Sequence, residues 1–151
     1  MRIGLWMAVA GMAAMPVAAI AAGGSLWHYT FQNGIAEYLT GEWDATTGGA
    51  LNLSCRGKGV SIMPQIRGQA PPANSRLRLT ASSRAGSRET AFMTDAQGSV
   101  QIADAGASAA FRQLWGDLRG RDIVTVRYAD GRQVVLSLAG AQKTLPTRPC
   151  G

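Results

Sequence analysis

After the first 21 residues, apolar and polar residues mostly alternate with a period of two, which is typical of strands that bury one face. Trp27, Tyr29 and Phe31 alternate with polar residues and are followed by Asn33-Gly34. Asn-Gly between two alternating runs favours a two-residue hairpin loop, because both residues tolerate a positive φ. This loop pairs Tyr29 with Tyr38 and predicts one face that carries four aromatic residues: Trp27, Tyr29, Phe31 and Tyr38.

The second arm of this hairpin has an alternative interpretation. Ile35, Leu39 and Trp43 also fall on one face of a helix. Gly41 disfavours that helix because glycine costs about 1 kcal/mol in a helix interior.

The same alternation predicts further strands along the chain, at about residues 51–56, 60–64, 76–81, 90–94, 99–102, 124–128 and 134–138. For the last hairpin we favour the three-residue loop 129–131 over a two-residue loop at Asp130-Gly131. The longer loop pairs Val126 with Val134 and keeps both apolar sets on one side. It requires Gly131 to adopt the left-handed region.

One segment follows the helical period instead. Phe111, Leu114, Trp115 and Leu118 recur at the spacing of one helix face, and Ser108 precedes them as a candidate N-cap. Gly120 is expected to be the left-handed residue that ends this helix. The chain shows no internal repeat and no linker, so we predict a single all-β domain, an antiparallel β-sandwich or small barrel. It should have about seven to eight strands and one α-helix at about 108–119.

The first 21 residues differ from the rest. Arg2 precedes a mostly apolar stretch, and Ala19-Ile20-Ala21 provides the small residues that a signal peptidase requires. The apolar stretch is shorter than the ~20 residues needed to span a bilayer. We therefore predict a signal peptide over residues 1–21, cleavage near Ala21, and a mature domain over 22–151. The mature form would be periplasmic or secreted, with no integral membrane segment.

Export determines the interpretation of the cysteines. Cys55 and Cys150 are the only two in the chain, and an oxidising compartment favours a disulfide between them. Two free thiols are the alternative, with one acting as a nucleophile. It is weaker because His28, the only histidine, would have to serve as the base.

The residue inventory limits the available chemistry. One histidine and two paired cysteines leave too few ligands for a zinc site, so we expect no metal and no cofactor. Export and the absence of basic runs interleaved with aromatics argue against nucleic acid as a partner. Paired carboxylates are enough for a glycosidase, so Glu37, Glu42 and Asp44 support one enzymatic alternative, a small hydrolase acting on cell-wall or glycan material.

Two residue groups are candidate binding surfaces. The first is the aromatic row of the first hairpin, which is either core or an exposed platform. The second is a basic set that could grip carboxylates or phosphates through paired hydrogen bonds, namely Arg76, Arg78, Arg84 and Arg88. Without Arg2 the chain carries 14 basic and nine acidic side chains, a formal charge of +5, and genome composition explains this excess of arginine as well as a binding role does.

These observations favour an exported binding module that is not an enzyme. It would be an accessory subunit, an inhibitor or immunity factor, or an envelope recognition protein. Its partner would be another envelope or secreted protein, or an anionic glycan. A structural envelope component without a ligand is a further alternative.

Overall fold

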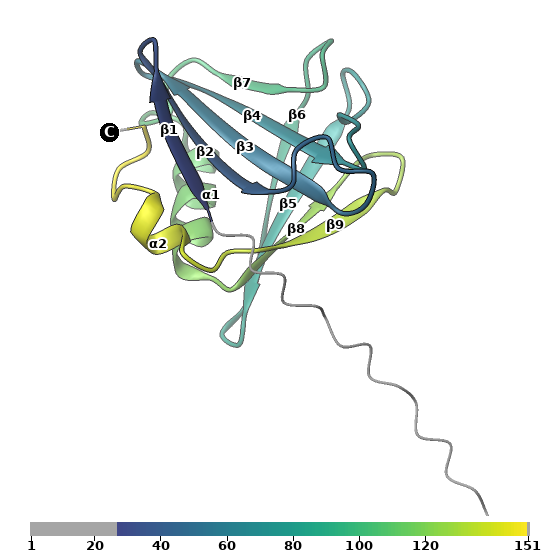
Figure 1. Cartoon of the computed structure of the whole chain (residues 1–151). Coiled ribbons are helices and arrows are strands. Elements are labelled where there is room, and N and C mark those ends of the chain that lie inside the picture. Colours follow the sequence, from purple (N-terminus) through teal and green to yellow (C-terminus); the bar gives the residue numbers. More distant parts are fainter. Residues whose placement is uncertain (1–26, 151) are drawn as a thin grey trace, which may run out of the picture.

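The computed structural model describes residues 27–150, which form two antiparallel sheets packed face to face (Figure 1). Sheet A contains, in spatial order, β1 (His28–Gln32), β2 (Ile35–Gly41), β3 (Gly49–Arg56), β4 (Gly59–Ile66) and β7 (Val100–Ile102). Sheet B contains, in spatial order, β6 (Gly86–Met93), β5 (Arg76–Ser83), β8 (Ile123–Arg127) and β9 (Gln133–Ser137). Within this part of the chain no strand pairing joins the two sheets, so the predicted β-sandwich is confirmed and the barrel alternative is wrong. The described part of the chain, residues 27–150, forms nine strands, slightly more than the seven to eight or so expected.

The first hairpin has the predicted register. Tyr29 pairs with Tyr38, and Phe31 pairs with Ala36. Asn33 and Gly34 form the turn with φ of 52° and 75°, as a loop with two positive φ angles requires. The segment after the turn is strand β2, so the helical alternative is wrong.

The last hairpin also agrees with the sequence. Val126 pairs with Val134, and the amide of Tyr128 donates to the carbonyl of Arg132 across the loop (2.9 Å). Gly131 has φ of 91°. Burial of both apolar sets on one side of the sheet has therefore selected the longer loop.

Strand β4 continues two residues beyond the end expected at Pro64. The neighbouring strand β7 pairs only with Val60 to Ile62. Alternation along the ladder directs the nitrogen of Pro64 toward the β7 side, where the pairing has already ended. A proline therefore fits there without the loss of a ladder hydrogen bond.

Helix α1 (Ala109–Gly120) matches the predicted helix, and the Ser108 side chain caps it by accepting from the amide of Phe111 (3.2 Å). The expected role of Gly120 is wrong. Gly120 is the last helical residue, and Arg121 follows in extended conformation with φ of −121°. The chain enters β8 only two residues later, and this leaves no room for a left-handed cap.

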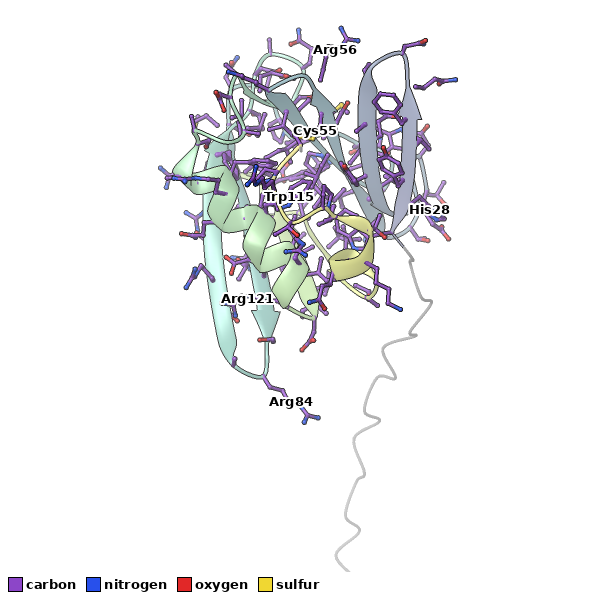
Figure 2. All side chains as sticks on the ribbon, turned by 90° about the vertical axis from the view of Figure 1, so that its left-hand side faces the viewer. His28, Cys55, Arg56, Arg84, Trp115 and Arg121 are labelled. Carbon is purple, nitrogen blue, oxygen red and sulfur yellow. A yellow bond between two sulfur atoms is a disulfide. The ribbon has the colours of Figure 1, made fainter. Side chains whose placement is uncertain are left out.

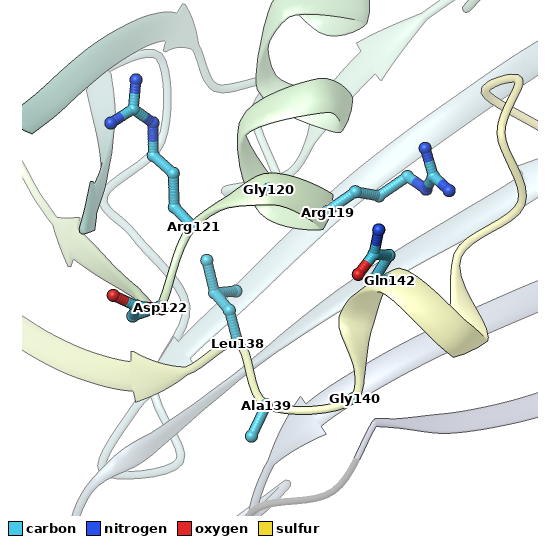
Figure 3. Close-up of a pocket in the computed structure, with 8 residues that line it drawn as sticks. All are labelled: Arg119, Gly120, Arg121, Asp122, Leu138, Ala139, Gly140 and Gln142. Carbon is cyan, nitrogen blue, oxygen red and sulfur yellow. The ribbon is translucent and has the colours of Figure 1, made fainter. Parts of the chain in front are cut away.

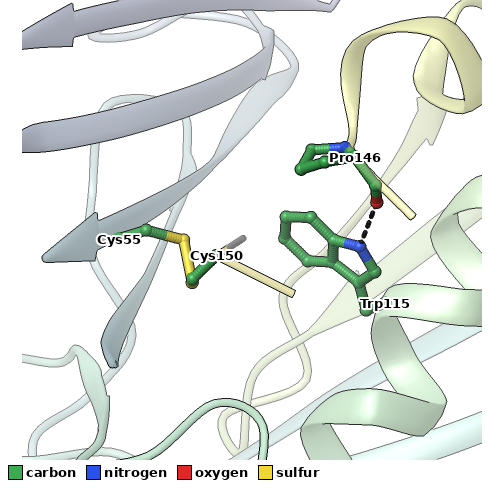
Figure 4. The surroundings of a disulfide bond; sticks show 4 residues. All are labelled: Cys55, Trp115, Pro146 and Cys150. Carbon is green, nitrogen blue, oxygen red and sulfur yellow. Dashed lines mark hydrogen bonds between the residues drawn. A yellow bond between two sulfur atoms is a disulfide. The ribbon is translucent and has the colours of Figure 1, made fainter. Parts of the chain in front are cut away.

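The C-terminal segment closes one end of the sandwich. After the short helix α2 (Ala141–Thr144), the chain returns to sheet A, where Cys150 forms the predicted disulfide with Cys55 (Figure 4). The indole N–H of Trp115 donates to the carbonyl of Pro146 (2.8 Å). The disulfide and this hydrogen bond together fasten the tail to β3 on one side and to α1 on the other.

The core lies between the two inner sheet faces. Sheet A contributes Leu51, Leu53 and Ile62, sheet B contributes Leu77, Leu79 and Val124, and α1 contributes Phe111, Leu114, Trp115 and Leu118. Among residues 27–150 no helix has both the length and the apolar character needed to cross a bilayer. The predicted signal peptide, residues 1–21, lies outside the described residues.

Candidate binding surfaces

The aromatic row of the first hairpin is divided between the core and the surface. Trp27 and Tyr38 are buried, whereas Tyr29 and Phe31 have 54% and 66% of their surface exposed. The ring of Trp115 packs edge-on against Tyr38, with ring centroids 5.5 Å apart, and the ring of Tyr29 also contacts Tyr38, with centroids 5.2 Å apart. The row is thus neither wholly core nor wholly platform, because β1 is an edge strand.

Burial also affects the chemistry of this row. Desolvation raises the pKa of the Tyr38 hydroxyl above its usual value, and the neighbouring Tyr29 adds to this effect. Tyr38 is therefore a neutral core residue at physiological pH. Only the outer two members of the row remain available for contact with a partner.

The structure does not gather the four predicted arginines. Arg76 and Arg78 lie on the outer face of sheet B, because the alternating Leu77 and Leu79 point into the core. Arg84 lies at the tip of the β5–β6 hairpin (Figure 2). Arg88 pairs with inward-facing Ala81 and approaches Asp117 of α1 (3.9 Å). These residues therefore face three different directions.

One of these arginines, Arg78, lies beside a further arginine that was not predicted from the sequence, Arg127. Arg78 of β5 pairs directly with Arg127 of β8, so the two cations lie side by side on the outer face. Like charges in directly opposite positions normally destabilise a sheet. Glu89 offsets part of this repulsion at 3.8 Å from Arg78, and Gln133 accepts two hydrogen bonds from Arg127 (2.7 and 3.0 Å). This pair could not be predicted from the sequence, because it depends on the register between β5 and β8, whose paired residues lie almost fifty positions apart.

Large apolar side chains are exposed on the same outer face. Met93 (60% exposed) pairs with Arg76, while Ile123 (38%) and Val135 (54%) belong to outward-facing positions of β8 and β9. We call this surface the arginine–aliphatic face, and its members are Arg76, Arg78, Met93, Ile123, Arg127 and Val135. It is the surface where the strand register brings basic and apolar exposed side chains together.

A shallow cavity lies on this face. Its volume is about 340 Å³, and it is lined by Thr80, Glu89, Thr125, Arg127, Gln133 and Val135. Hydroxyl, amide, guanidinium and aliphatic groups are thus available in one hollow. All four strands of sheet B contribute residues to the lining of this cavity.

A second cavity of about 470 Å³ lies between the end of α1 and the segment before α2 (Figure 3). Its two arginines point away from each other on either side of Gly120. Arg119 donates to the carbonyl of Leu145 (3.0 Å), and Arg121 donates to Asp117 (3.1 Å) and to the carbonyl of Gly86 (2.7 Å). Because both guanidinium groups already hold the fold together, this cavity offers no converging pair of cations.

The carboxylates of the hydrolase alternative are dispersed. Glu37 accepts from Thr30 (3.4 Å) on the outer side of sheet A. Asp44 exchanges two hydrogen bonds with Gln65 (2.8 and 3.1 Å), and Glu42 is exposed. None of the three carboxylates lines either cavity described above.

Within residues 27–150, His, Cys, Asp and Glu nowhere form a group of three that could hold a metal ion. The disulfide occupies both cysteines. His28, which the free-thiol alternative would need as its base, lies at the start of the edge strand β1 and is exposed (Figure 2).

Comparison with known proteins gives one assignment. The YfjT family model matches residues 25–145, which is most of the chain, so the chain belongs to the YfjT family. No curated protein and no solved structure matches the chain.

Proposed function

We propose that this member of the YfjT family is an exported, non-enzymatic module that binds an acidic surface of another envelope or secreted protein. The observation that carries the proposal is the arginine–aliphatic face. There, Arg78 and Arg127 lie directly opposite each other beside exposed Met93 and Val135. An unliganded sheet gains nothing from two adjacent cations, whereas a partner carboxylate would stabilise both.

The composition of the face supports a protein partner. Arginine and methionine are enriched in protein interfaces, and a guanidinium can bind a carboxylate through two parallel hydrogen bonds. Sugar-binding surfaces commonly use aromatic rings as stacking platforms. None of the members of the arginine–aliphatic face is aromatic, which favours a protein over an anionic glycan.

Two further observations support the proposed export of the protein. The leader-like segment 1–21 supports export, and the Cys55–Cys150 disulfide is compatible with an oxidising compartment. The hydrolase alternative has less support, because its carboxylates are dispersed and two of them are held by neighbouring side chains.

A charge-reversal experiment tests the proposed surface. The mature protein is used to capture partners from its native envelope fraction, and the double variant Arg78→Glu/Arg127→Glu is compared with wild type. The control is Arg84→Glu/Arg112→Glu, which makes the same change of charge at exposed positions elsewhere. We expect the first variant to lose at least ten-fold of the captured partner and the control to retain it. Equal capture by both double variants would overturn the proposal.

A second part of the experiment measures binding to anionic glycans. Wild type and both double variants are applied to immobilised alginate and heparin. If wild type binds these polymers and loses binding only in Arg78→Glu/Arg127→Glu, the partner is a glycan and the protein-partner proposal is wrong. Absence of polymer binding, together with selective loss of the captured protein, supports it.

A further inference from the structure

The edge strand β1 lacks the devices that usually prevent edge-to-edge association. Its five residues, His28–Gln32, include no proline, lysine or arginine and no acidic residue. Such residues commonly protect exposed edges. The other edges differ: β7 has only three residues, β6 carries Arg88 and Glu89, and β9 lies against β2 and β3.

The register of the first hairpin determines which backbone groups of β1 face outward. A two-residue loop makes its flanking residues a hydrogen-bonded pair, and such pairs then alternate along the ladder. His28, Thr30 and Gln32 therefore bond to β2. The N–H and C=O groups of Tyr29 and Phe31 point away from β2, toward the open side of the sheet.

The same two residues carry the exposed aromatic side chains. Tyr29 and Phe31 lie on the inner side of sheet A, the side of buried Tyr38, yet more than half of each remains exposed. Open hydrogen-bonding groups and uncovered apolar surface thus coincide on two alternate residues. A strand added to this edge would satisfy both.

We propose that a second copy of this chain occupies the edge, with the two β1 strands antiparallel around a two-fold axis at Thr30. This register places Tyr29 opposite Phe31 of the other copy, and Phe31 opposite Tyr29. Both residues of each pair have outward backbone groups, so four interchain hydrogen bonds form. The pairing is self-complementary and brings no charged side chains together, as a symmetric dimer requires.

Neighbouring registers are less favourable. A two-fold axis at Phe31 would require Asn33 to pair, but Asn33 belongs to the turn, with φ of 52°. An axis at Tyr29 would use Trp27, whose side chain is already buried. Only the axis at Thr30 pairs both exposed aromatic residues in both copies.

The area of the contact indicates a weak dimer. An aromatic side chain buries about 150–250 Å² when fully covered, so the four exposed rings together offer roughly 500 Å². The paired edges add to this value, but the total stays below the 1,200–2,000 Å² or so of a standard interface. We therefore expect a monomer–dimer equilibrium that responds to protein concentration.

A cysteine placed on the two-fold axis tests the register. In Thr30→Cys the two thiols would face each other in a non-hydrogen-bonded pair, whose Cα separation of about 4.5 Å suits a disulfide. The native cysteines are already joined, so the new thiol reacts alone. We expect Thr30→Cys to become a covalent dimer under mild oxidation.

The matched controls are His28→Cys and Gln32→Cys, which are exposed and lie on the same side of β1 as Thr30. Each alone should form no covalent dimer, because the two thiols of a dimer would lie about 13 Å apart along the strands. A mixture of the two controls should cross-link, since residue 28 faces residue 32 of the other copy. Cross-linking of all three single variants to the same extent would show random collision and overturn the register.

Analytical ultracentrifugation of proteins without an introduced cysteine gives an independent test. Wild type should sediment faster as its concentration rises from about 10 µM to about 1 mM, whereas Tyr29→Lys/Phe31→Lys should not. Thr47→Lys/Gln97→Lys adds the same charge at exposed positions elsewhere and should behave as wild type. A wild-type protein that stays monomeric over this range, with Thr30→Cys that does not cross-link, would overturn the proposal. The edge would then be open to an extended segment of another protein.

Discussion

At the scale of single residues, Asp117 is the most deeply buried charged side chain among residues 27–150. It is only 8% exposed and contacts Arg121 (3.1 Å) and Arg88 (3.9 Å). Arg121 in turn donates to the carbonyl of Gly86 on β6. Asp117 therefore holds the guanidinium that joins the end of α1 to sheet B.

The first prediction concerns this carboxylate. Asp117→Asn should lower the free energy of unfolding by about 1–3 kcal/mol, because it leaves partly buried Arg121 without a counter-charge. Urea unfolding measures the change. Asp122→Asn, at an exposed neighbouring position, is the control and should change stability by less than about 0.5 kcal/mol. Equal effects at both positions would contradict the role assigned to Asp117.

Tyr128 is a buried hydroxyl with a predicted effect on alkaline stability. Its hydroxyl donates to the carbonyl of Gln69 (3.0 Å), and burial raises its pKa well above the usual 10.0. The unfolded chain loses this proton near pH 10, whereas folded Tyr128 retains it. The unfolding free energy should therefore fall as the pH rises above about 10.

The second prediction follows from this shift. Tyr128→Phe should cost about 1 kcal/mol at neutral pH through the lost hydrogen bond. Its stability should then decline less steeply than that of wild type between pH 9 and 11, since of the two described tyrosines with a raised pKa only Tyr38 would remain. Thermal unfolding of both proteins at neutral pH and across this alkaline range measures the two effects. If stability falls with pH equally steeply in wild type and Tyr128→Phe, Tyr128 makes no contribution to the loss of stability at alkaline pH.

At the scale of elements, helix α1 contains a position that is not optimised for stability. Gly116 lies in its interior on the exposed side, and a β-carbon added there would meet nothing within 4 Å. The third prediction is that Gly116→Ala raises the free energy of unfolding by about 0.5–1 kcal/mol, because alanine has less freedom to lose on folding.

The control for this substitution is Gly49→Ala in β3. An added β-carbon at residue 49 would collide with the backbone carbonyl oxygen of Gln65 on β4, so this variant should be strongly destabilised. Urea unfolding of both variants provides the comparison. Destabilisation by Gly116→Ala would mean that this side of α1 is covered in solution.

Local elements could be predicted from the sequence because their signals are local. Asn33-Gly34 determined the first hairpin, and the matching of Val126 with Val134 determined the loop of the last one. The pairing of β5 with β8 could not be predicted, because it depends on long-range packing. Arg127 was therefore missed as the neighbour of Arg78. The exposure of Tyr29 was left open for the same reason, since it depends on how far α1 extends over sheet A.

At the scale of the whole molecule, the disulfide connects the end of the chain to β3 across 95 residues. In the chain-entropy view, a loop of this length stabilises the fold by roughly 4–5 kcal/mol. The fourth prediction is that Cys55→Ala/Cys150→Ala loses stability of this order in urea unfolding. A loss below about 1 kcal/mol would mean that the contacts of Trp115 and Arg119 with the tail suffice without the covalent bond.

The two faces of the molecule have separate roles in this account. The arginine–aliphatic face on sheet B would contact an acidic partner, and the β1 edge of sheet A would contact a second copy. Because these surfaces belong to different sheets, a dimer would present two partner-binding faces at once. Binding through two linked sites raises the apparent affinity without any new contact.

The measurement that tests the central claim most directly is site-specific photo-crosslinking in the native envelope. A photo-reactive residue replaces Val135, on the arginine–aliphatic face, or Gln101, on the outer face of sheet A. The account predicts that the probe at Val135 forms an adduct with a discrete protein, at a segment rich in Asp and Glu, and that the probe at Gln101 does not. An adduct at Gln101 with none at Val135 would contradict it.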